Sequence, residues 1–279
     1  MQTQMGTKAR TRTNAVRNEK EVRARIEALS YLPTAVEVAT KLIELGKDEN
    51  AEPAAYAKVI SADASLSSRL LALANSSYLG VRHQVTSVKL AVNLLGLATV
   101  RSLTLTYCMA GLYNELRLTA EEGHMFWEAS LCKALASKHY ARMQEEKMAD
   151  EAFACGLFQD FAIPIMYAVA KTGYLSILKD STADWKSQLE RERQLFGADH
   201  TVLGRVLAQK LELPEVFVDA VAFHHDFDSL SACLENGDMG GAVYAASLFP
   251  HLLDAWTQGD AEELRSYLQR NETGDLGNI

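Results

Sequence analysis

The sequence has few cysteines and no excess of positive charge. Its 279 residues include four cysteines, and acidic residues outnumber basic ones by 36 to 28, which gives a net charge of −8. Cys108, Cys132, Cys155 and Cys233 are widely spaced without a C-x-x-C pair, so we expect reduced, buried thiols rather than a zinc or redox site. The negative charge argues against direct binding of nucleic acid, which needs clustered positive charge.

Long apolar runs and common catalytic motifs are also missing. No apolar run approaches the roughly 20 residues needed to cross a bilayer, and no signal peptide opens the chain. We therefore expect a cytoplasmic protein that does not enter a membrane. No P-loop, G-x-G-x-x-G, G-x-S-x-G, H-E-x-x-H or zinc-finger spacing occurs, so nothing indicates the enzyme classes that these motifs define.

Strand signals are absent, and apolar residues recur at helical spacing along most of the chain. In "EVRARIEALSYLP", Val22, Ile26 and Leu29 fall on one face of a helix. Alternating apolar and polar runs flanked by hairpin dipeptides do not occur, nor does a repeat of fixed period. The sequence therefore predicts an all-α protein.

Capping residues predict where several helices begin and end. Ser87 is suited to cap one helix, and Gly96 is expected to separate it from the next. Thr119, with Glu122 three residues later, forms a capping box at the start of a long helix that runs towards Met143.

The sequence pattern changes near residue 116, and this change predicts two helical layers within one module, 19–270. We expect a first layer over 19–115 and a second, HD-like layer over 116–270. Residues 1–18 are basic without an acid, and we expect them to form a flexible tail or linker, as we do for 271–279.

One carboxylate stands inside an apolar run, "CGLFQDFAIP" (Cys155–Pro164). A buried carboxylate such as Asp160 is costly unless it is paired, hydrogen-bonded or bound to a metal. We expect a helix from Asp150 to about Gly173 to carry it. We further expect a protonated histidine, His200 or His225, or a water molecule to satisfy it.

Three other features are interpreted as structural. The charged stretch "LERERQLF" (189–196) is expected to form an exposed helix face, and Asn75 and Ser76 to cap and turn the chain. The tryptophans are expected to anchor helix packing, because no basic patch surrounds them. They are Trp127, Trp185 and Trp256.

Several stretches together resemble the HDOD family, a bacterial relative of the HD phosphohydrolases. They are "LPTAVEVATKLIEL", "YAKVISADASLSSRLLALANSSYLG", "TSVKLAVNLLGLATVRSLTL", "FWEASLCKALA", "EAFACGLFQD" and "FGADHTVLGRVLAQKLELPEVFVDAVAFHHD". The resemblance covers about 21–228, with Ala64 where the family often has proline. It implies a helical bundle like that of HD phosphodiesterases, with an N-terminal helical layer.

The resemblance also implies where a metal would bind in an HD-type enzyme. There, a histidine and an adjacent His-Asp pair hold a cation that orients phosphate and activates water. The dyad position here reads Gln159-Asp160, and the earlier position that often carries histidine is Ala129. Because two imidazoles are replaced, we expect no metal, no cofactor and no catalytic residues. The remaining candidate ligands are Asp160, His200, His224 and His225, which we expect to form structural hydrogen bonds.

The family resemblance implies a signalling role. We expect a non-catalytic HDOD module, the output part of a response-regulator-like protein, that presents a groove between the two layers to a protein partner. The basic tail would suit attachment to a sensory domain. A metal-dependent phosphohydrolase acting on a nucleotide or cyclic dinucleotide is the alternative, although no "GYP" string marks the cyclic-dinucleotide branch. A sensor that binds a nucleotide without cleaving it is a third.

Overall fold

The computed structural model describes residues 18–28, 37–38, 40–42, 44–45, 48, 51–76, 81, 84–180, 184–234 and 237–252. No strand occurs among these residues, which confirms the all-α prediction. Contacts divide the chain into two compact units. We call Ser30–Glu115 the small unit; Leu116–Ile279, together with Met1–Leu29, we call the large unit.

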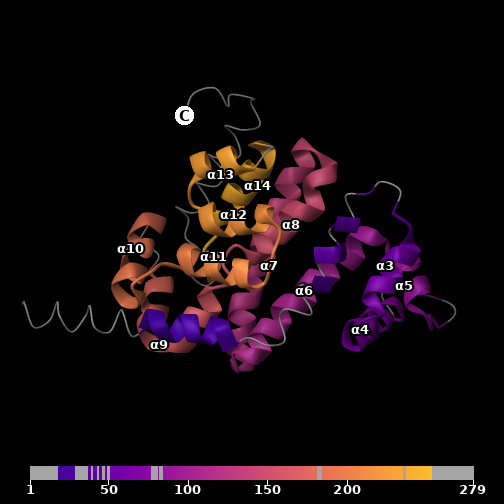
Figure 1. Cartoon of the computed structure of the whole chain (residues 1–279), viewed down its shortest axis with the longest axis horizontal. Helices are drawn as coiled ribbons and strands as arrows, with labels where there is room; N and C mark the ends of the chain where they lie inside the picture. Colours follow the sequence, from indigo (N-terminus) through magenta and orange to yellow (C-terminus); the bar gives the residue numbers. More distant parts are fainter. Residues whose placement is uncertain are drawn as a thin grey trace, which may run out of the picture. The chain divides into compact units, whose positions relative to one another are not determined.

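Four described helices build most of the small unit (Figure 1). They are α3 (Pro53–Ile60), α4 (Ala64–Ala74), α5 (Val88–Leu95) and α6 (Leu97–Glu115). α5 packs against both α3 and α4. Ser87 Oγ accepts a hydrogen bond from the Leu90 amide, and Gly96 ends α5 with a φ of +79°, as predicted. Asn75 ends α4, and its side chain exchanges two hydrogen bonds of 2.8 Å with the Val85 backbone, which confirms its turn role.

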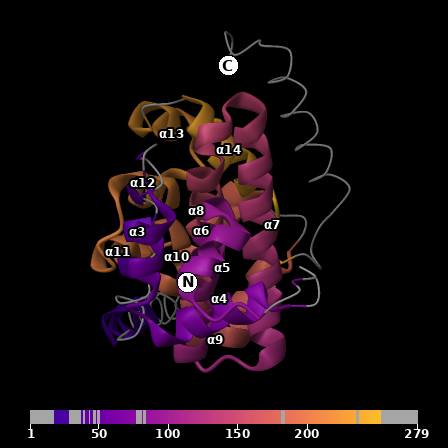
Figure 2. The same cartoon turned by 90° about the vertical axis from the view of Figure 1, so that its right-hand side faces the viewer.

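The large unit is a helical bundle with one long helix, α7, along one side (Figure 2). Its elements are α7 (Ala120–Gln144), the 3-10 turn η2 (Glu146–Met148), α8 (Ala149–Phe158), α9 (Ile163–Leu178), α10 (Trp185–Phe196), α11 (His200–Lys210), α12 (Glu215–Phe223), α13 (Phe227–Cys233) and α14 (Gly237–Ser247). α8 and α14 both pack along α7, and α12 packs against α8 and α11. The interior of this unit is therefore formed by helices that are distant in sequence.

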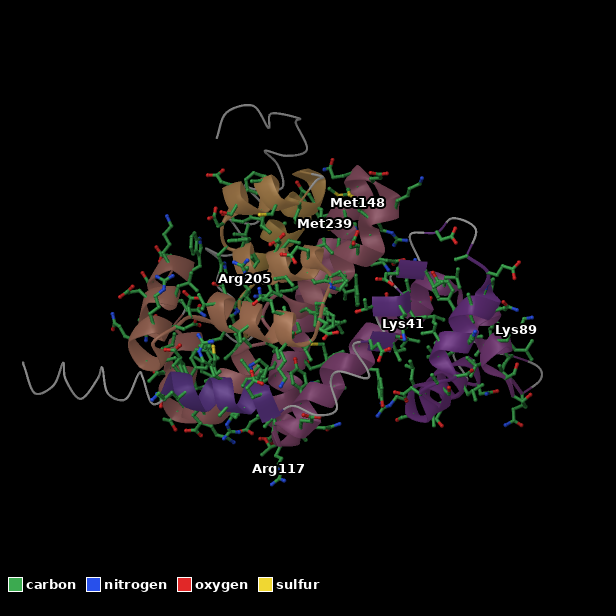
Figure 3. The ribbon with its side chains drawn as sticks, in the orientation of Figure 1. Lys41, Lys89, Arg117, Met148, Arg205 and Met239 are labelled. Atoms are coloured by element: carbon green, nitrogen blue, oxygen red, sulfur yellow. The ribbon has the colours of Figure 1, made fainter. Side chains whose placement is uncertain are left out.

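The capping box predicted for α7 is present. Thr119 Oγ1 accepts from the Glu122 amide at 3.2 Å, and Glu122 Oε2 accepts from the Thr119 amide at 3.0 Å. The hydrogen bond from Lys171, and then that from Thr119, lower the pKa of Glu122 to about 2. In the turn just before the box, exposed Arg117 has a φ of +53° and points away from the helices (Figure 3).

The predicted single helix from Asp150 to Gly173 is wrong, because the chain turns at residues 159–162 between α8 and α9. Pro164 lies in the first turn of α9. A proline clashes with the carbonyl four residues earlier in a continuous helix, and here that carbonyl belongs to Asp160. The Asp160 carbonyl instead accepts from the Ile163 amide at 2.9 Å. Asp160 therefore lies in a turn that faces the bundle interior.

The first described helix, 18–28, belongs with the large unit, whereas we had grouped residues 19–115 as one layer. Its Val22 and Ile26 are fully buried, and Lys210 Nζ donates to the Glu27 carbonyl at 2.6 Å. Apolar burial and this contact fix the helix on the bundle. The predicted tails, except residue 18, and Trp256 lie outside the described residues.

Among the described residues, Ala149–Leu178 contains an 18-residue window with a mean hydropathy of 1.5. By length and composition this segment would suit a membrane span, although no single apolar run in the sequence suggested one. However, 89% of its most apolar window is buried inside the protein, as in the core helices of a bundle.

Gly156 lies where α8 crosses α7 closely. A Cβ there would lie 2.7 Å from the Lys133 carbonyl oxygen and 2.9 Å from Ser137 Cβ. Gly156→Ala is expected to lower the free energy of unfolding by about 1–3 kcal/mol, because the two helices must separate. Gly123→Ala is the control, since its Cβ meets nothing within 4 Å; it should raise stability by about 0.5–1 kcal/mol. Urea denaturation measures both, and equal stabilities would contradict the close crossing.

Candidate functional site

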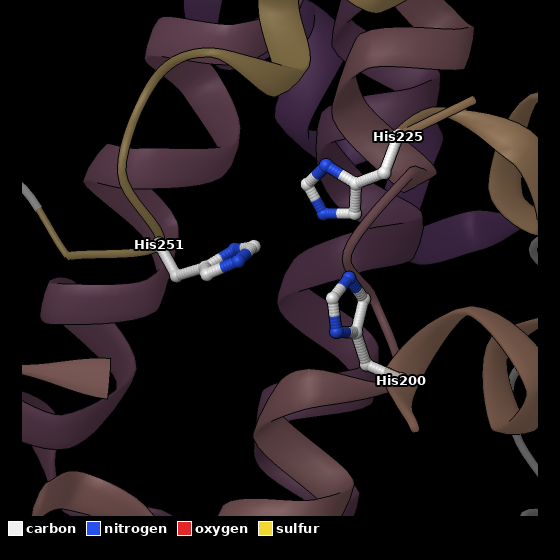
Figure 4. A group of neighbouring side chains, drawn as sticks. All are labelled: His200, His225 and His251. Atoms are coloured by element: carbon white, nitrogen blue, oxygen red, sulfur yellow. The ribbon is translucent and has the colours of Figure 1, made fainter. Parts of the chain in front are cut away.

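Charged and imidazole side chains gather in the interior of the large unit. We call them the buried cluster: Lys133, Asp160, Glu192, His200, His224, His225 and His251. None is more than 8% exposed. Figure 4 shows that His200, His225 and His251 reach one common space from three separate segments. The structure thus brings together the four residues named from the sequence and adds Lys133, Glu192 and His251.

Lys133, on α7, is the cation that satisfies Asp160. Its ammonium donates to Asp160 Oδ2, and it lies 3.2 Å from His251 Nδ1. Burial alone would raise the pKa of Asp160, but the charge of Lys133, together with His251 and His224, outweighs burial and holds that pKa well below its usual value. Lys133 was not among the partners expected from the sequence; it is fully buried and is the nearest cation to Asp160 among the described residues. Of the two histidines expected to pair with this carboxylate, His200 lies within reach, with its Nε2 3.5 Å from Asp160 Oδ1.

A second buried ion pair joins His200 to Glu192. Glu192 Oε2 lies 2.7 Å from His200 Nδ1 and also accepts from the His200 amide at 2.8 Å, while Tyr174 donates to Oε1 at 2.8 Å. Burial lowers the pKa of His200, but the charge and hydrogen bond of Glu192, together with the charges of Asp160 and Asp199, outweigh burial and the net shift is upward. Glu192 is fully buried, so the expectation of a wholly exposed face over 189–196 is wrong at this position.

Three atoms converge beside this pair. His224 Nδ1 lies 2.9 Å from the Val221 carbonyl, which only an N–H can satisfy, so its Nε2 presents a lone pair. That Nε2 lies 3.1 Å from His200 Nε2 and 3.2 Å from Asp160 Oδ1, and burial lowers the pKa of His224. With His200 protonated, a single N–H at its Nε2 faces both acceptors.

His225 occupies the edge of the cluster as a neutral ring. Its imidazole stacks on Trp185 with centroids 5.4 Å apart and an interplanar angle of 3°. Burial, followed by the charges of the neighbouring histidines, keeps the pKa of His225 well below its ordinary value. The stack confirms Trp185 as a packing anchor. His225 Nε2 and the Gln159 amide have no hydrogen-bond partner among the described residues.

The described side chains leave little space beside Asp160. A cavity of about 10 Å³ next to Asp160 has room for about one water. Its lining is Phe126, Ala129, Ser130, Asp160, Ile163, Pro164 and His251. The cluster therefore lies in the core of the large unit, and the groove expected between the two layers stays a prediction.

The fold and the cluster define a class, and comparison defines the family. The described residues of the large unit form an all-α bundle with four buried histidines and a buried aspartate. The family model of the HDOD domain matches residues 32–227, and the chain belongs to this family. It is similar to an HDOD domain protein from Geobacter sulfurreducens, with 21% identity, a TM-score of 0.61, and 82% of this chain and 76% of that one covered.

Two further proteins share this similarity. A protein from Shewanella amazonensis, provisionally named a phosphohydrolase, is 20% identical with a TM-score of 0.60, and 88% of this chain and 86% of that one are covered. An uncharacterised protein of Treponema pallidum (strain Nichols) is 22% identical over 215 residues. That alignment covers 72% of this chain but only 38% of the relative. The structural likenesses show the fold.

The resemblance to HD-type enzymes implies a bound metal ion. The positions of the ligand atoms in the cluster would suit such an ion, but the charges around them would not. Asp160 Oδ1, His200 Nε2 and His224 Nε2 are separated by 3.1–3.5 Å, close to the roughly 3.3–3.6 Å expected for atoms 2.0–2.2 Å from one tetrahedral ion. However, Lys133 already opposes the charge of Asp160, and the raised pKa of His200 favours the protonated ring, which opposes the charge of Glu192. An ion there would lie beside an ammonium and displace a proton. The residues as they stand therefore do not fit a bound cation.

Sequence reasoning missed three members of the cluster. Lys133 carried a signal, because it follows Ala129 by one helical turn within the apolar run "SLCKALA". His251 also lies in an apolar setting, "FPHLLDAW", beyond the part of the chain that resembles the family. Glu192 gave no signal, since it lies in a charged stretch that reads as exposed.

The buried histidines make stability depend on pH. Burial, followed by the Lys133 charge, lowers the pKa of His251 from 6.5 to about 4. Between these values the unfolded chain binds a proton that the folded chain does not, so the free energy of unfolding falls as pH falls from 6.5 to 4. His251→Asn should reduce this slope by up to about 1.4 kcal/mol per pH unit. Urea denaturation at a series of pH values measures it. Exposed His139→Asn is the control, and identical slopes for both variants would contradict the assignment.

Lys133 and Asp160 should be strongly coupled in stability. Lys133→Met leaves a buried carboxylate without its cation and is expected to cost about 3–5 kcal/mol. Adding Asp160→Asn should recover a large part of this loss, because the remaining amide carries no charge. A double-mutant cycle by chemical denaturation measures the coupling. Strictly additive losses would show that the pair does not act as a unit.

Proposed function

We propose that the protein is a non-catalytic HDOD signalling module that acts by binding another macromolecule rather than by hydrolysis. The observation that carries this proposal is the internal charge compensation of the buried cluster. Lys133 and His200 oppose Asp160 and Glu192 without any added ion. A site of this kind stabilises the core, and its structure does not call for a metal.

Hydrolysis by an HD-type mechanism would need more than this cluster offers. A metal must activate a water and contact a phosphate, so the site must admit the substrate. Here the neighbouring cavity has room for about one water, and Asp160 is engaged by Lys133. Gln159 and Ala129 provide no imidazole at the positions where the family resemblance implies one.

The role we propose is the output part of a response-regulator-like protein in a bacterial cytoplasm. Membership of the HDOD family supports a signalling module. We propose that the partner is another protein of the signalling pathway. A nucleotide is the alternative ligand, which the melting experiment described below would detect. The net charge of −8 supports a partner other than nucleic acid.

A metal-dependent phosphohydrolase remains the second candidate function. It is favoured by one observation, the 3.1–3.5 Å triangle formed by Asp160 Oδ1, His200 Nε2 and His224 Nε2. In this alternative, these residues would hold an ion that orients a nucleotide or cyclic-dinucleotide phosphate. It requires Lys133 to give up its contact with Asp160.

Elemental analysis of wild-type protein tests the proposal. Protein purified without chelator is incubated separately with Mn²⁺, Fe²⁺, Ni²⁺, Zn²⁺ and Mg²⁺ and then desalted. We expect no stoichiometric metal and no turnover of bis(p-nitrophenyl) phosphate, nucleotides or cyclic dinucleotides. A nucleotide-dependent rise in melting temperature without turnover would identify the ligand-binding form of the proposed module.

The contradicting result is equally specific. One or two tightly held ions, lost in Asp160→Asn but retained in Asp150→Asn, would overturn the non-catalytic proposal and favour the hydrolase. Asp150 is the matched control because it is also paired with a lysine, Lys138, at 2.9 Å, but lies outside the buried cluster.

A further inference from the structure

The two imidazoles closest to Asp160 are already oriented as metal ligands usually are. His200 Nδ1 is 2.7 Å from a Glu192 oxygen, and His224 Nδ1 is 2.9 Å from the Val221 carbonyl. In metal sites, a ligating histidine commonly donates its far N–H to a carboxylate or carbonyl, which fixes its tautomer and ring orientation. Both Nε2 atoms are consequently turned towards Asp160 Oδ1.

The separations of these atoms match a single ion. His200 Nε2 lies 3.1 Å from His224 Nε2 and 3.5 Å from Asp160 Oδ1, and the third side of the triangle is 3.2 Å. All three residues are buried, so the triangle is held by the core. Two nitrogens and one oxygen suit Zn²⁺ and Co²⁺.

Lys133 is the feature that opposes such an ion. Its ammonium contacts the other oxygen of the same carboxylate and lies 3.2 Å from His251 Nδ1, so its contacts are a carboxylate oxygen and an imidazole nitrogen. These are ligand types that a divalent cation would also use. In a buried setting, repulsion between this ammonium and a second cation is weakly screened.

We infer that Lys133 is the specificity-determining residue of a latent divalent-cation site formed by Asp160, His200 and His224. Its ammonium supplies the positive charge that Asp160 needs and so excludes a cation. Replacing Lys133 with a neutral side chain opens this site to Zn²⁺ or Co²⁺. The inference rests on the proposed function, in which the wild-type cluster binds no metal. It goes further by naming the residue that excludes the ion and the ligands that would receive it.

Metal titration of neutral variants tests this inference. Wild type, Lys133→Met and Lys138→Met are titrated with Co²⁺, followed by visible absorption, and with Zn²⁺ against a chromogenic chelator. Lys133→Met is expected to bind one ion at least on the order of 10²-fold more tightly than wild type. Lys138 is the matched control because it lies on the same helix and pairs with Asp150, away from the cluster. Its variant should behave like wild type.

A melting experiment makes the test independent of the stability of one variant. Bound ions should raise the melting temperature of Lys133→Met, because a ligand that binds only the folded state stabilises it. Lys133→Gln is the second variant, since its amide can still donate to Asp160 without a charge. If either variant is unfolded without metal, Zn²⁺ or Co²⁺ should restore its helical circular dichroism. Adding Asp160→Asn should abolish the gained binding.

The outcomes separate this inference from the proposed function. Stoichiometric metal in wild type would overturn both. A metal-free wild type with neutral variants that neither bind an ion when folded nor fold on its addition would overturn the inference alone. Binding that survives Asp160→Asn would also overturn it, because the ion would then lie elsewhere. Binding in the Lys133 variants, lost with Asp160→Asn, supports the latent site.

Discussion

The interior of the large unit depends on the contact between the Lys133 ammonium and the Asp160 carboxylate. Each charge would be strongly unfavourable in this core without the other, and removing one partner of such a pair costs far more than replacing both. The pair links the middle of α7 to the turn between α8 and α9, and His251 adds the segment after α14 to the same point. Segments far apart in sequence are thus held together by one buried cation.

The second ion pair, His200 with Glu192, extends this arrangement. Tyr174, Gln188 and the His200 amide also donate to Glu192, so its carboxylate is well satisfied. The proton on His200 then faces His224 Nε2 and Asp160 Oδ1. A cluster that in geometry could hold a metal is therefore compensated by one ammonium and one imidazolium. This charge compensation is the physical basis of our proposal that the site is structural and that the module acts by binding.

The local parts of the fold could be predicted because they depend on neighbouring residues. The Thr119–Glu122 capping box and the Gly96 break follow from short-range geometry, and both are present. The turn before Pro164 follows from the same kind of rule, but the apolar character of residues 150–173 obscured it. The burial of Glu192, in contrast, could not be predicted from neighbouring residues. Its charged surroundings in the sequence indicate exposure, and only the packing of α10 buries it.

The sequence by itself determined the all-α architecture, the family, and the histidines and aspartate that could meet in one site. These properties lie in helical periodicity, caps and motif spacing. The tertiary structure alone decided which cation reaches Asp160, because Lys133 is 27 residues from it and 118 residues from His251. It also decided the protonation of the rings, since burial and nearby charges shift the pKa values of His200 and His251 in opposite directions. Contact and desolvation depend on how the helices pack, and no local pattern in the chain specifies that.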